Sequence, residues 1–88
     1  MLSEPQSWQL SDSVSLRPEP FGAMAYDFKS RRLTFLKTPL LVSVVESLRE
    51  SETVGAALDA CQVQGDRRAT YLAALDRLAE GGMLVPKE

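Results

Sequence analysis

The first half of the chain alternates apolar with polar residues in three short stretches. Val14 and Leu16, for example, stand between serine and arginine neighbours, and this period of two is typical of a half-buried β-strand. Prolines on both sides of Glu19 end the first stretch, because proline cannot donate a hydrogen bond to a sheet. The pattern predicts three strands, at residues 13–17, 21–28 and 32–37.

The same alternation predicts which side chains share a face. In the second strand the larger side chains, Met24, Tyr26 and Phe28, lie on one face, and we expect Tyr26 to belong to the core. In the third strand Leu33 and Phe35 point one way, and Arg32, Thr34 and Leu36 point the other way. We expect Leu33 and Phe35 to face the core, where they support the strand and do not touch a ligand.

The second half repeats its apolar residues every three or four positions, as amphipathic helices do. Thr38 and Pro39 suit a helix start, because threonine can cap the first turn and proline there loses no needed hydrogen bond. Gly81 and Gly82 suit a helix end, because glycine adopts the left-handed conformation at little cost. The pattern predicts three helices, at residues 39–50, 53–61 and 66–80, and a short strand at 83–85.

Three short strands followed by three short helices predict a fold of the α+β class. We expect a winged helix-turn-helix-like domain over residues 13–86, with a three-stranded antiparallel sheet followed by the helices. Residues 1–12 are polar and are expected to form a loose tail, with Trp8 and Leu10 as its anchors. If the strands form a meander, the third strand is an edge with unpaired N–H and C=O groups.

Composition narrows the range of functions. The chain has 88 residues, enough for one domain with one modest core. It contains no histidine and a single cysteine, Cys61, which excludes imidazole metal sites, Ser-His-Asp triads and an internal disulfide. We therefore predict no catalytic residues, no metal and no cofactor. No apolar run is long enough to span a membrane, and we expect a cytoplasmic protein without a membrane partner.

The charges are unevenly distributed. The net charge is −2, but residues 29–37 alone carry +4, from Lys29, Arg31, Arg32 and Lys37. Arg67 and Arg68 fall in the first turn of the third predicted helix, where the helix dipole disfavours cations. An acidic ligand between the third strand and the third helix would offset this cost. Alternatively, the strand charges protect an exposed edge from aggregation, and Asp66 offsets the two arginines.

Two blocks of sequence resemble a known family. They are the run LRPEPFGA at 16–23, followed by Tyr26, and the run RRLTFLK at 31–37; the closing GGMLVP at 81–86 is also similar. These blocks resemble the small peptide-binding chaperones of mycofactocin biosynthesis (MftB-type). That family belongs to the PqqD-like recognition elements for ribosomally made precursor peptides. The resemblance covers residues 8–86.

The resemblance implies a non-catalytic role. Such chaperones bind the acidic leader of a short precursor peptide and present it to a radical S-adenosylmethionine maturase. An extended leader would pair with the free edge of the third strand, and basic and apolar side chains would select it. The expected peptide-binding residues lie on the basic strand and the third helix: Lys29, Arg31, Arg32, Thr34, Leu36, Lys37, Arg67, Arg68, Tyr71, Leu72 and Leu75.

Two other functions remain open from the residues alone. A winged-helix DNA-binding protein shares the expected fold and would place Arg67 and Arg68 at the start of a recognition helix. The net charge and the acids Asp66, Asp76 and Glu80 on that helix oppose it, because phosphates repel them, and we predict no nucleic-acid partner. A regulatory domain that dimerises through the edge strand is the second alternative.

Overall fold

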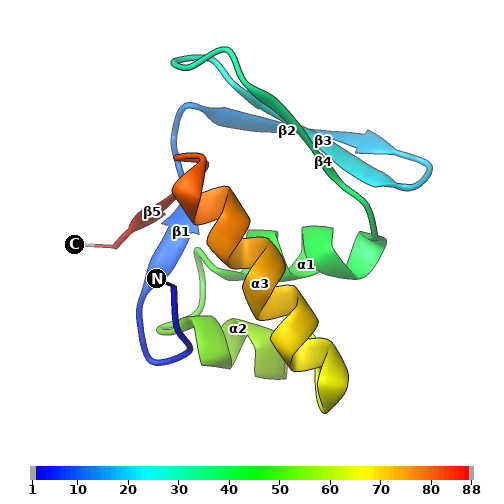
Figure 1. The fold of residues 1–88 in the computed structure, drawn as a ribbon, viewed down its shortest axis with the longest axis vertical. Helices are drawn as coiled ribbons and strands as arrows, with labels where there is room; N and C mark the ends of the chain where they lie inside the picture. Colours follow the sequence, from blue (N-terminus) through cyan, green and yellow to red (C-terminus); the bar gives the residue numbers. More distant parts are fainter. Residues whose placement is uncertain (1, 88) are drawn as a thin grey trace.

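The computed structural model describes residues 2–87 and contains two small antiparallel sheets and three helices (Figure 1). Strands β2, β3 and β4 form one sheet in that order, and β1 pairs with β5 in the other. In Figure 1 the three-stranded sheet lies on one side of the molecule, and all three helices lie on the other side. The elements are β1 (Trp8–Leu10), β2 (Val14–Glu19), β3 (Gly22–Asp27), β4 (Leu33–Leu36), α1 (Pro39–Ser47), α2 (Val54–Ala60), α3 (Asp66–Glu80) and β5 (Leu84–Pro86).

The α+β class and the three-stranded antiparallel sheet followed by three helices are confirmed. The winged helix-turn-helix label stays a prediction. β4 pairs only with β3, so it is an edge strand as expected from a meander. No helix within residues 2–87 is long and apolar enough to cross a membrane.

Two of the helices, α1 and α2, begin at threonine caps, whereas α3 follows Gly65 without a side-chain cap. The Thr38 hydroxyl accepts a hydrogen bond from the Leu41 N–H at the start of α1, and Thr53 does the same for α2. α3 spans the predicted residues, ending at Glu80 with Gly81 as its C-cap. α1 ends at Ser47, three residues earlier than predicted, because residues 49–52 turn toward α2.

The sheet faces are the reverse of the sequence-based expectation. Ala23, Ala25 and Leu36 point toward the helices and are buried. Leu33 and Phe35, which we expected in the core, are exposed on the opposite face, and Tyr26 is exposed there as well. The physical reason is the close packing of α1 against β3 and β4. Small alanines allow this approach, so the larger side chains lie outside.

The N-terminal segment is packed, which corrects the expectation of a loose tail. Leu2 is buried, and its N–H donates to the Asp76 carboxylate on α3 at 2.9 Å. Trp8 lies opposite Pro86 in the β1–β5 ladder. Residues 2–10 therefore belong to the domain, held by contacts with segments that come much later in the sequence. The predicted strand at 83–85 is found as β5, shifted by one residue.

Gly22 is needed where β3 passes close to the end of β4. A Cβ atom at this position would overlap the Leu36 carbonyl oxygen and touch the Thr38 backbone. We expect Gly22→Ala to lower the free energy of unfolding by about 1–3 kcal/mol, the usual cost of overpacking. Urea denaturation measures this. Gly81→Ala is the matched control, because its Cβ would meet only ordinary contacts beyond 3.4 Å. Equal stability of the two variants would contradict the argument.

Candidate functional site

A groove runs between the edge strand β4 and the helix α3. It consists of two adjoining hollows of about 250 and 290 Å³, which share Thr34, Arg77 and Leu78. The first hollow extends to Thr38 at the start of α1, and the second extends to Gly81 just beyond α3. The groove therefore follows β4 along its whole length.

The backbone of β4 is open on the side away from β3. The Asp27 N–H donates to the Arg32 carbonyl at 2.9 Å, and hydrogen-bonded pairs alternate along an antiparallel ladder. Ala25–Thr34 and Ala23–Leu36 are therefore the next hydrogen-bonded pairs. The N–H and C=O groups of Leu33 and Phe35 consequently point to the free edge, where another strand can pair with them.

The α3 wall of the groove is formed by residues spaced three and four apart, which share one helix face. The half-buried Tyr71 and Ala74 and the buried Leu78 supply its apolar part. The Tyr71 hydroxyl lies 2.9 Å from the Thr38 hydroxyl, and this hydrogen bond closes one end of the groove. Since Thr38 also caps α1, the same residue fixes three elements around the site.

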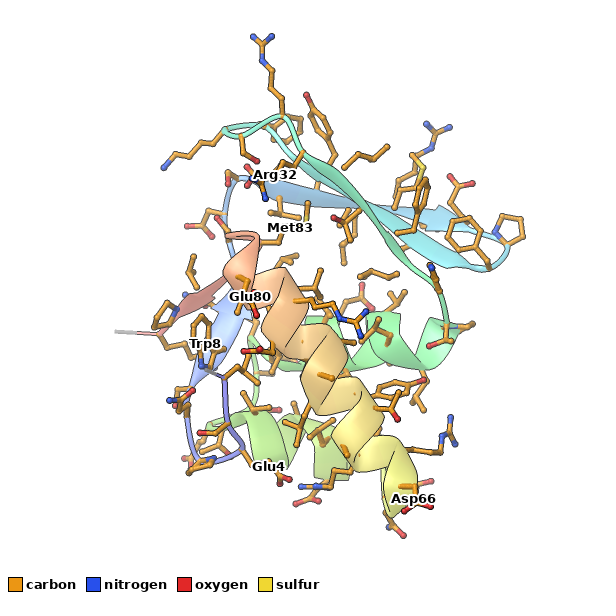
Figure 2. The ribbon with its side chains drawn as sticks, viewed as in Figure 1. Glu4, Trp8, Arg32, Asp66, Glu80 and Met83 are labelled. Atoms are coloured by element: carbon orange, nitrogen blue, oxygen red, sulfur yellow. The ribbon has the colours of Figure 1, made fainter. Side chains whose placement is uncertain are left out.

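The charges along the groove are all positive. Arg32, Lys37 and Arg77 line it, and no carboxylate lines either hollow among the residues that the structure describes. None of the three forms an ion pair with another residue in the 2–87 range. Figure 2 shows Arg32 near Met83, just beyond the end of α3. The groove therefore combines apolar walls with unpaired cations, which suits an acidic, partly apolar segment.

Asp27 holds the hairpin that carries these cations. Its buried carboxylate accepts hydrogen bonds from the Ser13 hydroxyl at 2.8 Å and from the Lys29 N–H at 2.9 Å. The Ser13 hydrogen bond lowers the pKa of Asp27, so the carboxylate stays charged. The turn brings Arg31 to a positive φ of 61° and directs the chain into β4. Asp27 is a positioning residue that the strand pattern did not indicate.

The structure brings together only part of the expected site. Thr34, Leu36, Lys37 and Tyr71 line the first hollow, and Arg32 lines the second. Leu36 is almost fully buried and forms the floor of the groove. The remaining expected residues lie elsewhere: Lys29, Arg31, Arg67, Arg68, Leu72 and Leu75.

Lys29 and Arg31 lie in the exposed β3–β4 turn, beyond the end of the groove. Arg67 lies next to the groove, with its guanidinium 5.9 Å from the centre of the Tyr71 ring, within cation–π range. Leu75 is completely buried, and Leu72 packs against the core. The α3 wall of the groove is therefore formed by the helix face that carries Tyr71 and Ala74, and not by the adjacent face that carries Leu72 and Leu75.

Arg68 is occupied by partners within the protein. Its guanidinium lies 2.6 Å from the Glu4 carboxylate and 2.8 Å from the Asp59 carboxylate, and it donates to the Val63 and Gly55 carbonyls. The hydrogen bond from Arg68 lowers the pKa of Glu4, and the hydrogen bonds to the Glu4 and Asp59 carboxylates raise the pKa of Arg68. Arg68 therefore joins the N-terminal segment to α2 and α3, and these contacts give it a structural role.

The sequence analysis missed four residues that line the α3 side: Thr70, Ala74, Arg77 and Leu78. The spacing from Tyr71 could have indicated Ala74 and Leu78, because positions three and seven residues later share its helix face. Leu41 on α1 was also missed.

The chain matches the peptide chaperone MftB family over residues 7–85. The match covers the strand β4 and the helices α1 and α3 that form the groove. The chain therefore belongs to the peptide chaperone MftB family. Membership shows a peptide chaperone role, which is non-catalytic, so the prediction that the chain is not an enzyme is confirmed.

Three curated relatives of the MftB family agree. The chain is 48% identical over 80 residues to peptide chaperone MftB of Mycolicibacterium smegmatis, covering 91% of this chain and 78% of the relative. It is 45% and 39% identical over 83 residues to the proteins of that name from Mycobacterium ulcerans and Mycobacterium tuberculosis. Each of these two alignments covers 94% of this chain and 76% of the relative. No solved structure matches the chain.

Proposed function

We propose that the chain binds the acidic leader of the mycofactocin precursor peptide by strand addition along β4 and presents it to a radical S-adenosylmethionine maturase. One observation supports this most: an open strand edge borders a groove whose charged side chains are all cations. The family supplies the peptide chaperone role, and the groove suggests how the peptide is held.

In strand addition, backbone hydrogen bonds provide affinity and side-chain contacts provide specificity. The four open backbone groups of Leu33 and Phe35 pair with the leader backbone, which gives affinity with little sequence preference. Apolar leader side chains fill the groove between Leu36, Tyr71 and Leu78. Arg32, Lys37 and Arg77 meet the leader carboxylates and speed encounter, whereas the apolar contacts slow release.

An NMR amide titration at physiological salt tests the proposal. The three ligands are a synthetic mycofactocin precursor leader, a scrambled version of it, and a DNA duplex. We expect only the authentic leader to shift residues of β4 and residues 70–78 of α3. Shifts produced by the duplex would support the DNA-binding alternative, and no shift with any ligand would exclude the proposed site. A stable dimer without any peptide affinity would support the regulatory alternative.

Two neighbouring proline substitutions separate strand addition from simple charge attraction. Leu33→Pro removes an N–H at the open edge, where proline is tolerated, so we expect a folded protein with peptide affinity reduced by about tenfold or more. Thr34→Pro removes an N–H that pairs with β3, so we expect the protein to lose its fold, which circular dichroism would detect. Leu33→Ala controls for the lost side chain. Unchanged affinity of folded Leu33→Pro, relative to Leu33→Ala, would argue against backbone pairing.

Presentation to the maturase needs a separate measurement. Size-exclusion chromatography of the maturase with this chain, with and without the leader, should show a complex that contains all three components. A leader that leaves this chain whenever the maturase binds would contradict the presentation step while leaving peptide binding intact.

A further inference from the structure

The sheet face away from the helices is unusually apolar. The large hydrophobic side chains that are exposed within residues 2–87 all lie on this sheet or in the turns between its strands: Phe21, Tyr26, Phe28, Leu33 and Phe35, with exposed fractions of 42, 36, 64, 49 and 49%. Figure 2 shows side chains projecting from the sheet on the side opposite the helices. We call this surface the outer face. Exposed apolar patches of this kind mark binding surfaces in soluble proteins.

Two residues of the outer face coincide with the open edge. Leu33 and Phe35 are the β4 residues whose backbone groups are free, and they are also the β4 residues whose side chains point outward. In a strand pair, residues directly opposite each other place their side chains on the same face, with Cβ atoms about 5 Å apart. A strand added to β4 therefore directs alternate side chains onto the outer face, next to Leu33 and Phe35.

We infer that the bound peptide is recognised on both of its faces: its outward side chains are apolar and pack against Leu33 and Phe35, while its inward side chains enter the groove. This inference rests on the proposed strand addition and defines the peptide sequence that the same site selects. Phe35 is held in place for this contact by Phe21, whose ring meets it edge-on at 5.8 Å between ring centres.

The geometry sets the pattern of the recognised segment. β4 has four residues and spans about 13 Å, so about four peptide residues pair with it. Two of them, at alternate positions, face Leu33 and Phe35 and are apolar. The other two face the groove, where aliphatic side chains meet Leu78 and an acidic one meets Arg77. Acidic residues before and after this segment reach Arg32 and Lys37 at the two ends. The expected ligand is thus a short apolar segment between acidic residues.

On the outer face, Phe28 provides a control residue for the contacts proposed at Leu33 and Phe35. Phe28 is the most exposed of these side chains, but it follows the end of β3 and has no β4 residue opposite it. Its ring packs against Tyr26, one strand away from the open edge. A peptide strand on β4 lies about 10 Å from β3, too far for close contact with Phe28.

The test compares Leu33→Ser and Phe35→Ser with Phe28→Ser by calorimetry, using a synthetic mycofactocin precursor leader. We expect each of the first two variants to bind about tenfold more weakly or worse, and Phe28→Ser to bind within about twofold of the parent. Equal binding by all three variants would overturn the inference. If charge reversal in the groove still abolishes binding in that case, the proposed function stands; if it does not, the proposed function fails as well.

A serine scan of the leader on the unchanged protein gives an independent readout. Recognition on both faces predicts sensitivity at consecutive positions of the paired segment. Sensitivity at only every second position would show that one face alone is recognised and would overturn the inference.

Discussion

Reversing two charges in the groove, with Arg32→Glu and Arg77→Glu together, is expected to weaken binding of the acidic leader by about 100-fold or more. Both side chains line the groove, no carboxylate lines it within the described residues, and neither arginine has an ion-pair partner there. A hydrogen bond to a charged group contributes about 1.5–3 kcal/mol, and each 1.4 kcal/mol changes affinity tenfold. Calorimetry at physiological salt measures the loss.

The matched control carries the same charge change on the β3–β4 turn. Lys29→Glu with Arg31→Glu alters the net charge equally, but both side chains lie outside the groove. We expect a slower association rate and a loss of affinity below about fivefold, because distant charges act mainly on encounter. If the turn variant loses as much affinity as the groove variant, the attraction comes from the overall field of the hairpin.

Arg68→Met is expected to lower the free energy of unfolding by about 2–4 kcal/mol, because it leaves two carboxylates and two carbonyls without their donor. The leader affinity of the folded protein should not change. Thermal and urea denaturation measure the stability, and Arg67→Met is the control because Arg67 is exposed and forms no ion pair within residues 2–87. Equal stability of the two variants would contradict the role given to Arg68.

The same contact predicts a dependence on pH. The Arg68 hydrogen bond lowers the pKa of Glu4 below its ordinary value of 4.5. A depressed carboxyl pKa stabilises the fold above the unfolded-state value, and this contribution is lost as the pH falls through the folded-state value. The stability difference between the parent and Arg68→Met should therefore be full near neutral pH and shrink below about pH 4.5. A difference that does not change with pH would exclude the Glu4 ion pair as its source.

The helices could be predicted because their signals are local. Thr38 and Thr53 cap the helices that they precede, and Gly82 adopts the left-handed conformation just after α3, so the neighbouring sequence is sufficient. The free edge of β4 was predictable for a similar reason, because short links between consecutive strands favour a meander.

The sheet faces could not be predicted from side-chain size. Ala23 and Ala25 alternate with Met24 and Tyr26, and a preference for large apolar residues inside selects the wrong set. The deciding factor is the closeness of α1, which the strand sequence does not contain. Small inward residues beside large outward ones leave apolar side chains exposed, which fits the proposed peptide contact on the outer face.

The positions of the expected site residues could not be predicted from the sequence where they depend on distant parts of the chain. Arg68 resembled a free cation because its partner Glu4 lies 64 residues earlier in the sequence. Arg77 lies in the last turn of α3, where a cation is common for helix stability alone, so its position did not suggest a binding role. Its place in the groove depends on how α3 is rotated relative to β4, and no local pattern encodes that rotation.

The β1–β5 ladder, in which Trp8 lies opposite Pro86, brings the two ends of the domain side by side (Figure 1). A polypeptide with adjacent ends tolerates circular permutation, since a short linker can join them. New ends opened at the Lys29–Ser30 turn would leave the ladder and the helices connected. The domain is for the same reason suited to insertion as a unit into a loop of a larger protein.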